Sequence, residues 1–258
     1  MDLSNILTFI MPVRVDSKER MRNITTVLSW LAPLQCKFLL LEADCHRHII
    51  RKKIEPYKNI VDYTFIRDCN PIFHRTLYIN ILLKQAKTEV IAVWDADIIT
   101  PHSQINEAVN YIINKGNTLA YPYSGKYVLL PHHTTLKFVK DHDLAYIENM
   151  DFKSLFGRPF CGGAFFVHRE RYLSLGGENE HFIGWGPEDV ERLKRVKIMG
   201  HKVTWTDKGA AYHLSHPRNE NSNFFSNEVA CTTRRELMKI CSMTPKELQN
   251  YINTWKWK

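Results

Sequence analysis

The chain has 258 residues, of which 44% are hydrophobic and 24% charged, a composition that excludes a disordered or fibrous protein. Its length suits one large domain, or one domain with a small extension. Lys and Arg outnumber Asp and Glu by 35 to 27, and the net charge of +8 favours anionic partners such as nucleotides, phosphates or acidic glycans. The basic residues are dispersed, apart from residues 51–53 and the terminal WKWK, so no nucleic-acid partner is expected.

The cysteine spacing and the first apolar run predict the cellular compartment of the protein. Six cysteines, at positions 36, 45, 69, 161, 231 and 241, show no CxxC or paired spacing, which predicts reduced thiols in a cytoplasmic protein. The apolar run ILTFIMPV, residues 6–13, is too short for a membrane span and lacks a basic leader, so it predicts a first strand rather than a secretion signal. A peripheral contact at the inner face of a membrane is the remaining membrane hypothesis.

Strands and helices are predicted to alternate through the first half of the chain. The strand at 6–13 precedes a helix at 17–31, which begins at a capping box of Asp16 with Glu19. Its apolar residues recur at helical spacing: Met21, Ile24, Leu28 and Leu31. A strand at 37–44, a basic helix at 45–54, a strand at 62–68, a helix at 75–86 and a strand at 89–94 follow. This order predicts an α/β fold with a mostly parallel, Rossmann-like central sheet flanked by helices.

Acidic residues follow three of these strands. In a parallel sheet, ligands bind beyond the carboxyl ends of the strands. Asp44, Asp68 and the pair Asp95 and Asp97 are therefore expected on one rim.

The last segment of the chain predicts a packed helix. In TPKELQNYINTW, Thr244 is the cap and Pro245 the first helical residue, while Leu248, Ile252 and Trp255 form one apolar stripe. The WKWK tail could instead touch a membrane surface or an acidic acceptor. We predict a catalytic domain at residues 1–220 and a helical extension at 221–258 that packs on the same domain.

The segment WDAD ends an apolar strand with two carboxylates. A DxD sequence can be a solvated turn, but charge at the end of a buried strand needs a partner. Oxygen ligands at this position suit Mg²⁺ or Mn²⁺ bound together with a diphosphate. Asp95 and Asp97 are therefore candidates for a metal–diphosphate site.

The segment FIGWGPEDVERLKRV is the more specific signal. Glu188 and Asp189 open a predicted helix whose apolar stripe is Val190, Leu193 and Val196. Two acids at a helix start can simply complement the macrodipole. That explanation does not account for Trp185 between two glycines, whereas a carboxylate beside an aromatic face can hold a sugar hydroxyl and remove its proton.

The segment AAYHLSHPR supplies nitrogen ligands. His213 and His216 follow a strand-like run at 202–207, and Pro217 favours a loop around them. A single histidine is usually structural, but two histidines downstream of an acidic metal candidate are the ligands that it lacks.

Taken in order, these motifs resemble the metal-dependent GT-A glycosyltransferases, in particular the β4-galactosyltransferases and the galactosyltransferase-like domains of bacterial chondroitin polymerases. The likeness runs over residues 6–220 and rests on MPVR, FHR, WDADIIT, FCGGAFFV, GWGPEDVE and AYHLSHPRNEN. It implies a catalytic base, Asp189, and metal ligation by Asp97 with His213, or with His216 as the alternative. The donor-binding candidates are Pro12, Arg14, Asp44, Asp68, Phe73, Arg75, Asp95, Ala96, Gly162 and Gly163, and the acceptor-binding candidates are Trp185, Gly186 and Glu188.

The chain departs from the resembled family in two ways. Pro187 stands where the family has a third glycine, and the membrane anchor and disulfides of the Golgi members are not seen, which favours a bacterial-type cytoplasmic enzyme. The resemblance implies an Mn²⁺- or Mg²⁺-dependent inverting transferase. It would move a sugar, galactose as the first choice, from a UDP-sugar to an oligosaccharide or lipid-linked glycan in surface polysaccharide synthesis.

Three rival hypotheses remain. They are a retaining enzyme similar to the polypeptide N-acetylgalactosaminyltransferases, a sugar-phosphate nucleotidyltransferase, and a non-catalytic carbohydrate-binding protein. The second would need a Gly-rich loop after the first strand, and MPVRVDSKER has no glycine.

Overall fold

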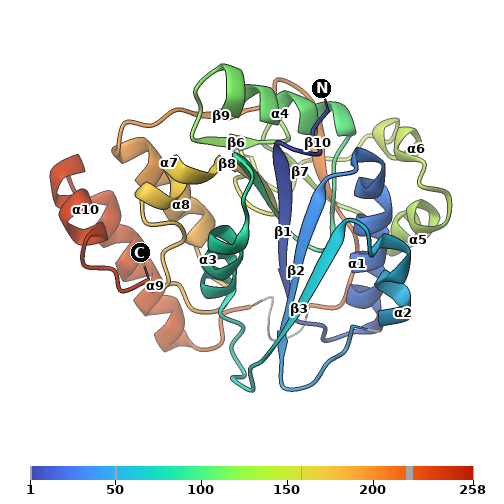
Figure 1. Ribbon diagram of the computed structural model, residues 1–258, viewed down its shortest axis with the longest axis horizontal. Coiled ribbons are helices and arrows are strands. Elements are labelled where there is room, and N and C mark those ends of the chain that lie inside the picture. The colour runs from blue at the N-terminus through green and yellow to red at the C-terminus, as the bar shows by residue number, and fades with distance from the viewer. Residues whose placement is uncertain (1, 50, 158, 219–222, 258) are drawn as a thin grey trace.

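The computed structural model describes residues 2–49, 51–157, 159–218 and 223–257. These residues form a seven-stranded sheet with the order β3-β2-β1-β4-β8-β6-β9 and a three-stranded sheet with the order β5-β10-β7. Figure 1 shows β1, β2 and β3 between α1 and α2 on one side and α3 on the other.

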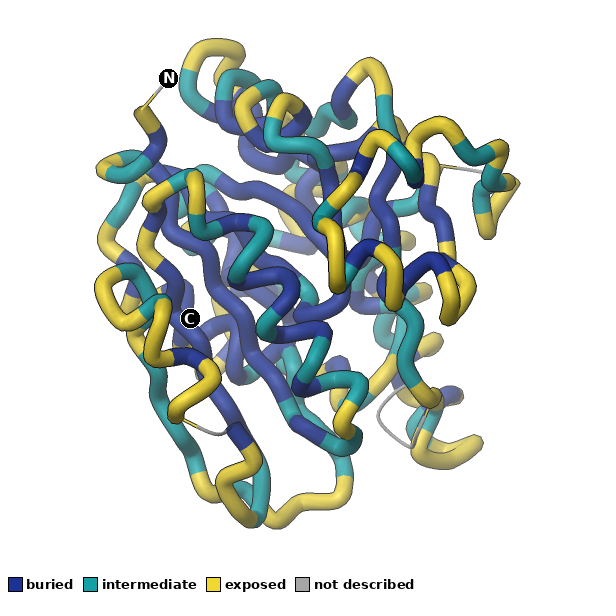
Figure 2. Tube along the Cα trace, turned by 90° about the vertical axis from the view of Figure 1, so that its right-hand side faces the viewer, coloured by how far each residue is buried: buried dark blue, intermediate teal, exposed yellow. Residues whose placement is uncertain are grey.

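The strands of the large sheet are β1 (Leu7–Val13), β2 (Lys37–Asp44), β3 (Val61–Arg67), β4 (Val90–Trp94), β6 (Leu119–Tyr121), β8 (Ala164–His168) and β9 (Val203–Trp205). β1 and β4 are buried along their whole length, as expected for apolar runs covered on both faces. The tube in Figure 2 shows these strands as a buried interior surrounded by exposed loops. The sequence predictions at 6–13, 37–44, 62–68 and 89–94 are confirmed to within one residue at each end.

The sheet is parallel from β3 to β4 and then contains one reversed strand. β8 pairs antiparallel with both β4 and β6, whereas β6 and β9 pair parallel. The small sheet contains β5 (Ile98–Ile99), β7 (Lys126–Leu129) and β10 (Ala210–His213). Its pairing of β10 with β5 brings residues 210–213 next to the segment that follows β4.

The helices are α1 (Lys18–Leu31), α2 (Arg51–Ile54), α3 (Arg75–Gln85), α4 (His102–Asn114), α5 (His132–Asp141), α6 (Leu144–Glu148), α7 (Arg169–Ser174), α8 (Glu188–Ile198), α9 (Asn227–Cys241) and α10 (Pro245–Ile252). Short 3₁₀ turns cover Ala32–Leu34 and Glu55–Tyr57. Within the described ranges, no helix is long and apolar enough to cross a membrane.

Two helix predictions are wrong in detail. The predicted capping box of Asp16 with Glu19 is replaced by Ser17, whose hydroxyl accepts the backbone N–H of Arg20, while Asp16 pairs with the Arg20 side chain. The predicted basic helix at 45–54 is helical only at Arg51–Ile54, and residue 50 lies outside the described residues. In the part before it, the backbone N–H groups of His48 and Ile49 donate to the buried Glu42 carboxylate instead of to a helix.

The prediction of reduced thiols is wrong for two of the six cysteines. Cys45 and Cys69 form a disulfide, with their Cα atoms 4.3 Å apart, while Cys36, Cys161, Cys231 and Cys241 are free. The reason is the register of β2 and β3, which places Asp44 opposite Arg67 and so brings the residues after both strands together. This proximity depends on strand pairing and has no signature in the spacing of the cysteines.

The terminal helix packs as predicted. Thr244 and Glu247 form a capping box, and Leu248, Ile252 and Trp255 are buried in a small cluster with Ile240 of α9. Trp255 is only 5% exposed, so it is not available to a membrane surface. Figure 1 shows α9 and α10 together at the side of the molecule near α8. The division at residue 220 stays a prediction.

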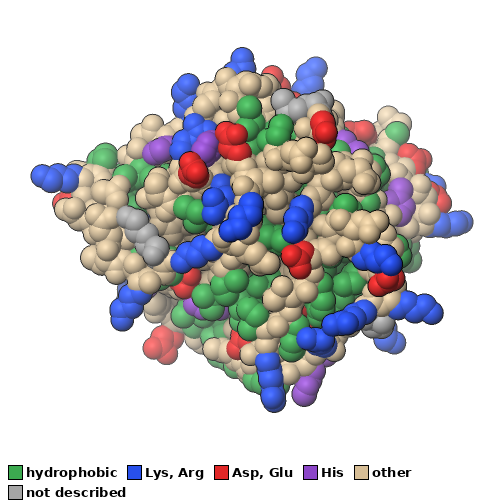
Figure 3. Space-filling model, viewed as in Figure 1, with side chains coloured by type: hydrophobic (Ala, Val, Ile, Leu, Met, Phe, Trp, Pro, Cys, Tyr) green, Lys and Arg blue, Asp and Glu red, His purple; other side chains and the backbone are tan. Residues whose placement is uncertain are grey.

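The surface charge is mixed on the face that Figure 3 shows. Lys and Arg side chains are distributed over this face and alternate with Asp and Glu.

Candidate active site

The acidic pair follows β4 directly, at the carboxyl edge of the parallel strands. The backbone N–H of Asp95 donates to the carbonyl of Gly163 at 2.8 Å, which ties the acidic turn to the start of β8. The two carboxylates then contact different cations. Asp95 Oδ1 accepts a hydrogen bond from Arg75 Nη2 at 2.6 Å, whereas Asp97 Oδ2 lies 3.5 Å from Arg20 Nη1. Asp95 is thus paired with Arg75 of α3, whereas Asp97 lies near Arg20 of α1.

Asp97, His213 and His216 form a candidate metal group. Asp97 Oδ2 lies 3.6 Å from His213 Nε2 and 3.0 Å from His216 Nε2, and one ligand atom from each residue lies within 4.8 Å of the others. The small sheet creates this proximity, because His213 pairs with Ile98 and the N–H of Leu214 donates to the Asp97 carbonyl at 2.8 Å. The sequence ranked His213 above His216, and the structure places both imidazoles beside Asp97.

The protonation of this group suits a divalent cation. Burial would raise the pKa of Asp97, but His213, His216 and Arg20 hold that pKa well below its ordinary value. Burial lowers the pKa of His213 and favours its neutral form. An ionised carboxylate and neutral imidazoles are the forms that ligate metals, and a bound cation would replace the positive charge of the imidazoles beside Asp97. One oxygen and two nitrogen donors fit Mn²⁺ better than Mg²⁺, which prefers oxygen ligands.

Asp189 lies in the first turn of α8 with its two oxygens in different surroundings. Oδ1 accepts a hydrogen bond from Arg192 Nη1 at 2.7 Å. Oδ2 faces Gly162, where an added Cβ would lie only 2.3 Å from this oxygen. The structure therefore brings the predicted base against the predicted donor-sugar segment, and only a glycine leaves room for it.

The neighbouring small residues also have defined places. Gly163 has φ of +78°, and a Cβ there would approach the side chains of Ile98 and Tyr127. Ala96 is 6% exposed between the two acids of the DxD segment.

Glu188 and Arg75 line one pocket and each has an unused polar atom. The pocket is formed by Pro71, Ile72, Phe73, Arg75, Gly184, Trp185, Glu188, Asn223 and Phe225. Within the described ranges, Glu188 Oε2 and Arg75 Nη1 are buried without a hydrogen-bond partner. Burial, followed by the nearby Asp189, raises the pKa of Glu188 to about 8. At neutral pH Glu188 is therefore a neutral acid that can donate a hydrogen bond to a ligand.

Arg14 forms hydrogen bonds to the loop at residues 68–71, which borders this pocket. Its Nε donates to the carbonyl of Ala43 at 3.0 Å, and Nη1 donates to the carbonyls of Asn70 and Pro71 at 2.7 and 3.2 Å. Nη2 donates to Asp68 Oδ2 at 3.2 Å. All three guanidinium nitrogens contact protein oxygens, so direct contact between Arg14 and a nucleotide stays a prediction.

The other predicted donor-binding residues at this rim lie near Arg14 and make contacts within the protein. Asp68 Oδ2 also accepts the hydroxyl of Tyr78 at 2.6 Å, and Phe73 stacks on the Tyr78 ring with centroids 5.3 Å apart. Asp44 Oδ1 accepts the N–H of the next residue, and Pro12 is buried within β1. Asp44 and Asp68 thus lie at the rim as expected, and their contact with a donor stays a prediction.

Trp185 forms an exposed aromatic wall of the pocket. Its side chain is 48% exposed and meets Phe224 edge-on, with ring centroids 4.8 Å apart. Gly184 before it has φ of +74°, and Gly186 after it lies against Thr233 of α9. The tight turn therefore holds the indole at the surface beside Glu188.

Three features of the site were not found in the sequence. Arg20 contacts Asp97 from α1, Phe224 and Phe225 contribute to the aromatic wall, and Arg192 holds Asp189. Only Arg192 had a readable signal, because a cation three residues after an acid lies on the same helix face.

The predicted apolar stripe of α8 is also wrong in part. Val190 and Leu193 are only partly buried, whereas the buried side of the helix carries Glu188, Glu191, Arg192, Arg195 and Val196. Ion pairs allow the charges of Glu191, Arg192 and Arg195 to be buried.

Part of the chain is similar to a known protein family. The family model described as the N-terminal domain of galactosyltransferase matches residues 145–217, a range that contains Gly162, Trp185, Asp189, His213 and His216. No curated protein matches the sequence.

Three solved structures are similar to most of the chain. The catalytic domain of Drosophila β1,4-galactosyltransferase 7 in complex with xylobiose gives a TM-score of 0.55 at 16% identity and covers 93% of this chain and 82% of that chain. A mutant of that enzyme with manganese, UDP-Gal and xylobiose gives 0.52 at 17% identity, with coverage of 88% and 79%. GalNAc-T7 with UDP, GalNAc and Mn²⁺ gives 0.62 at 13% identity, with coverage of 96% of this chain and 50% of that chain.

These similarities agree with the α/β element order of the chain. The predicted fold class is confirmed. The chain has the GT-A fold of the glycosyltransferases, with a segment at residues 145–217 that matches the galactosyltransferase family model.

Proposed function

We propose that this protein is a metal-dependent, inverting glycosyltransferase that moves a sugar from a UDP-sugar to a hydroxyl group of a glycan. The observation that carries the proposal is the group of Asp97, His213 and His216 at the end of the parallel strands. Two of the similar structures were solved with manganese or Mn²⁺ and with UDP-Gal or UDP, which supports this choice of cofactor and donor.

The donor side is assigned to the residues around the acidic pair. Asp97, His213 and His216 would hold Mn²⁺, or Mg²⁺ with lower preference. When bound, the cation neutralises charge on the leaving diphosphate. Arg75 is fixed by Asp95 and keeps Nη1 free for a donor oxygen, while Phe73 offers an aromatic face in the same pocket.

The acceptor side is assigned to the start of α8. Asp189 would take the proton of the acceptor hydroxyl through Oδ2, because Oδ1 is occupied by Arg192. Glu188, neutral at pH 7, would donate a hydrogen bond to the sugar, and Trp185 would stack on its apolar face. Attack by this hydroxyl on the anomeric carbon, opposite the leaving diphosphate, inverts the anomeric centre.

The finer assignments rest on resemblance. Galactose is the first choice of sugar, and N-acetylgalactosamine is the second. The acceptor would be an oligosaccharide or a lipid-linked glycan in surface polysaccharide synthesis, on a cytoplasmic enzyme that touches the inner face of a membrane peripherally. The disulfide of Cys45 with Cys69 removes the argument from reduced thiols for this compartment.

The first experiment is calorimetric binding of UDP with and without Mn²⁺. Wild type should bind UDP tightly only with the metal, and Asp97→Ala should lose the metal-dependent part. Asp141→Ala is the matched control, because Asp141 is an exposed carboxylate paired with Lys137 away from the site. Metal-independent binding, or no binding, would contradict the proposal and favour a carbohydrate-binding protein.

The second experiment addresses the base. Asp189→Asn should lower kcat by about 10²–10⁴-fold, the usual contribution of a positioned general base, while UDP and Mn²⁺ still bind. Full turnover in this variant would remove Asp189 from the mechanism. The anomeric configuration of the product, measured by NMR, separates inversion from the retaining alternative.

A further inference from the structure

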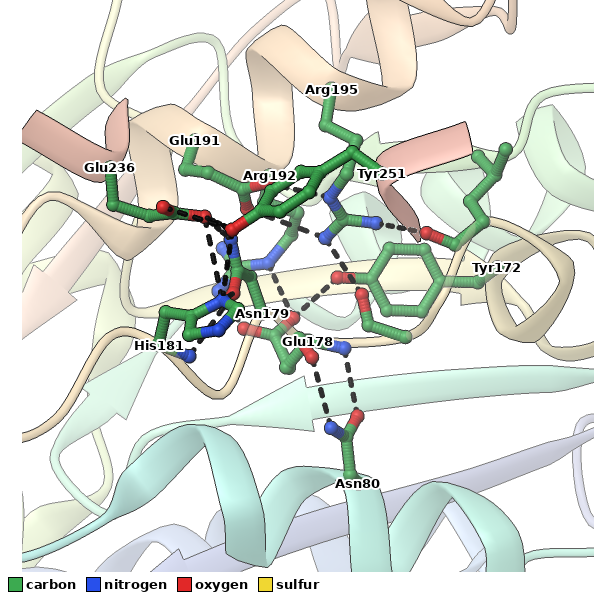
Figure 4. A network of polar contacts seen from close by, with 12 residues as sticks. Asn80, Tyr172, Glu178, Asn179, His181, Glu191, Arg192, Arg195, Glu236 and Tyr251 are labelled. Atoms are coloured by element: carbon green, nitrogen blue, oxygen red, sulfur yellow. Dashed lines mark hydrogen bonds and ion pairs between the residues drawn. The ribbon is translucent and has the colours of Figure 1, made fainter. Parts of the chain in front are cut away.

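Arg192 and Glu178 form a buried ion pair next to the proposed base. Arg192 Nε and Nη2 donate to the two oxygens of Glu178 at 2.7 and 2.8 Å, and both side chains are at most 1% exposed. Figure 4 shows the pair at the centre of a polar network between α8 and the segment after α7. The guanidinium carbon Cζ of Arg192 lies 3.8 Å from the ring centroid of Phe165 in β8.

Glu178 is itself fixed from several directions. Its carboxylate accepts the Tyr172 hydroxyl, its N–H donates to Asn80 Oδ1 at 2.7 Å, and its carbonyl accepts Asn80 Nδ2 at 2.9 Å. Burial would raise the pKa of Glu178, but Arg192 lowers it to about 2, so the carboxylate is ionised at neutral pH. The anchor of Arg192 is therefore both charged and immobile.

The remaining nitrogen of Arg192 reaches the active site. Nη1 donates to Asp189 Oδ1 at 2.7 Å, and the Asp189 side chain is 24% exposed whereas Arg192 is fully buried. With Oδ1 held, Oδ2 is directed at Gly162. The contacts form a chain from the buried anchor through Arg192 to Asp189 Oδ1, and within the described residues Oδ2 accepts no hydrogen bond.

Stability alone does not explain this arrangement. A buried ion pair is often no more stabilising than apolar side chains of similar volume, because removing two charges from water is costly. The same helix carries a second buried pair, Glu191 with Arg195, whose Nε–Oε1 distance is also 2.7 Å. Arg195 donates its other N–H groups to the carbonyls of Leu175 and Gly177, and within the described residues it makes no hydrogen bond to Asp189. The first pair therefore contacts the proposed base, whereas the second contacts backbone carbonyls.

We propose that Arg192, anchored by Glu178, is a positioning residue that orients the Asp189 carboxylate for proton transfer from the acceptor hydroxyl. This inference rests on the proposed function. It predicts that the pair contributes to kcat through the geometry of Asp189 and contributes little to donor binding, because the bond runs only to the base. A displacement of about 1 Å in a reacting group can cost about 10²-fold in rate.

The test compares two charge-neutral double variants. Glu178→Gln with Arg192→Met removes the first pair and retains an acceptor for the Tyr172 hydroxyl, whereas Glu191→Gln with Arg195→Met removes the second. Both lose one buried ion pair that includes an arginine of α8, so melting temperatures report their common structural cost. We expect kcat to fall about 10²-fold in the first variant and to stay close to wild type in the second, with unchanged affinity for UDP and Mn²⁺ in both.

Equal kcat values in two folded double variants would overturn the inference, and so would a loss of UDP affinity that accounts for the whole effect. If the first double variant does not fold, Arg192→Lys and Arg195→Lys provide the same comparison, because each keeps the charge and loses the paired hydrogen bonds. In that case kcat must fall in Arg192→Lys alone. Failure of the proposed function is seen separately, as absent UDP-sugar turnover in wild type or full turnover in Asp189→Asn.

Discussion

Glu188 provides a quantitative test of the electrostatics of the site. It is 7% exposed, its Oε2 has no partner within the described residues, and burial raises its pKa from 4.5 to about 8. Between these two values the unfolded chain has lost this proton and the folded chain keeps it, so folding becomes less favourable as pH rises. The full effect is about 5 kcal/mol, of which about 3 kcal/mol develops between pH 5 and pH 8.

The substitution Glu188→Gln removes the ionisation and keeps the shape of the side chain. We expect its free energy of unfolding, measured by urea denaturation and compared with wild type, to rise by about 3 kcal/mol between pH 5 and pH 8. Glu170→Gln is the control, because Glu170 is exposed on α7 and its replacement should give the same difference at both pH values. A pH-independent difference for Glu188→Gln would refute the reasoning.

The same variant bears on acceptor binding. Above pH 8 the wild-type carboxyl becomes an anion and can no longer donate a hydrogen bond, so its KM for the acceptor should rise. The KM of Glu188→Gln should stay constant over this range, since its amide donates at every pH. Parallel KM profiles would show that Glu188 does not donate to the acceptor.

Further predictions concern a glycine and the disulfide. Gly162→Ala should lower kcat by about 10–100-fold while UDP binding persists, because the new Cβ would displace Asp189. Gly157→Ala is the control and should match wild type, because a Cβ at that position meets no atom of the described residues within 4 Å. Equal kcat values in the two alanine variants would contradict the close approach. Replacing Cys45 and Cys69 with alanine should lower the free energy of unfolding by about 3 kcal/mol, since the bond closes a loop with a sequence separation of 24. An unchanged urea midpoint would show that the bond does not constrain the unfolded chain.

The sequence predicted the elements that depend on local periodicity and caps. The strand at 37–44 is β2 without a shift, the helix at 75–86 is one residue shorter in the structure, and the Thr244 cap begins α10. The predicted helix at 45–54 failed over most of its length because a side chain from the preceding strand binds its backbone N–H groups. Residues 48 and 49 bind the Glu42 carboxylate instead of forming a helical turn.

Strand pairing across the chain lay beyond the sequence. The reversal of β8, the small sheet that joins β5 to β10, and the disulfide of Cys45 with Cys69 each depend on which strands become neighbours. A strand has the same alternation of side chains whichever way its partner runs. The alternating pattern therefore identifies strands and leaves their partners open.

By itself, the sequence determined which chemical groups stand at the ends of which strands and helices, because apolar periodicity locates those ends and the residue types are read directly. Asp97, Asp189, Trp185 and the two histidines were identified in this way. Only the tertiary structure decided what each group faces: both imidazoles lie beside Asp97, Arg14 is committed to a loop, and Glu178 anchors Arg192. The physical reason is that partners of a buried charge come from elements far apart in the chain, and burial and electrostatics act through distance in space rather than along the sequence.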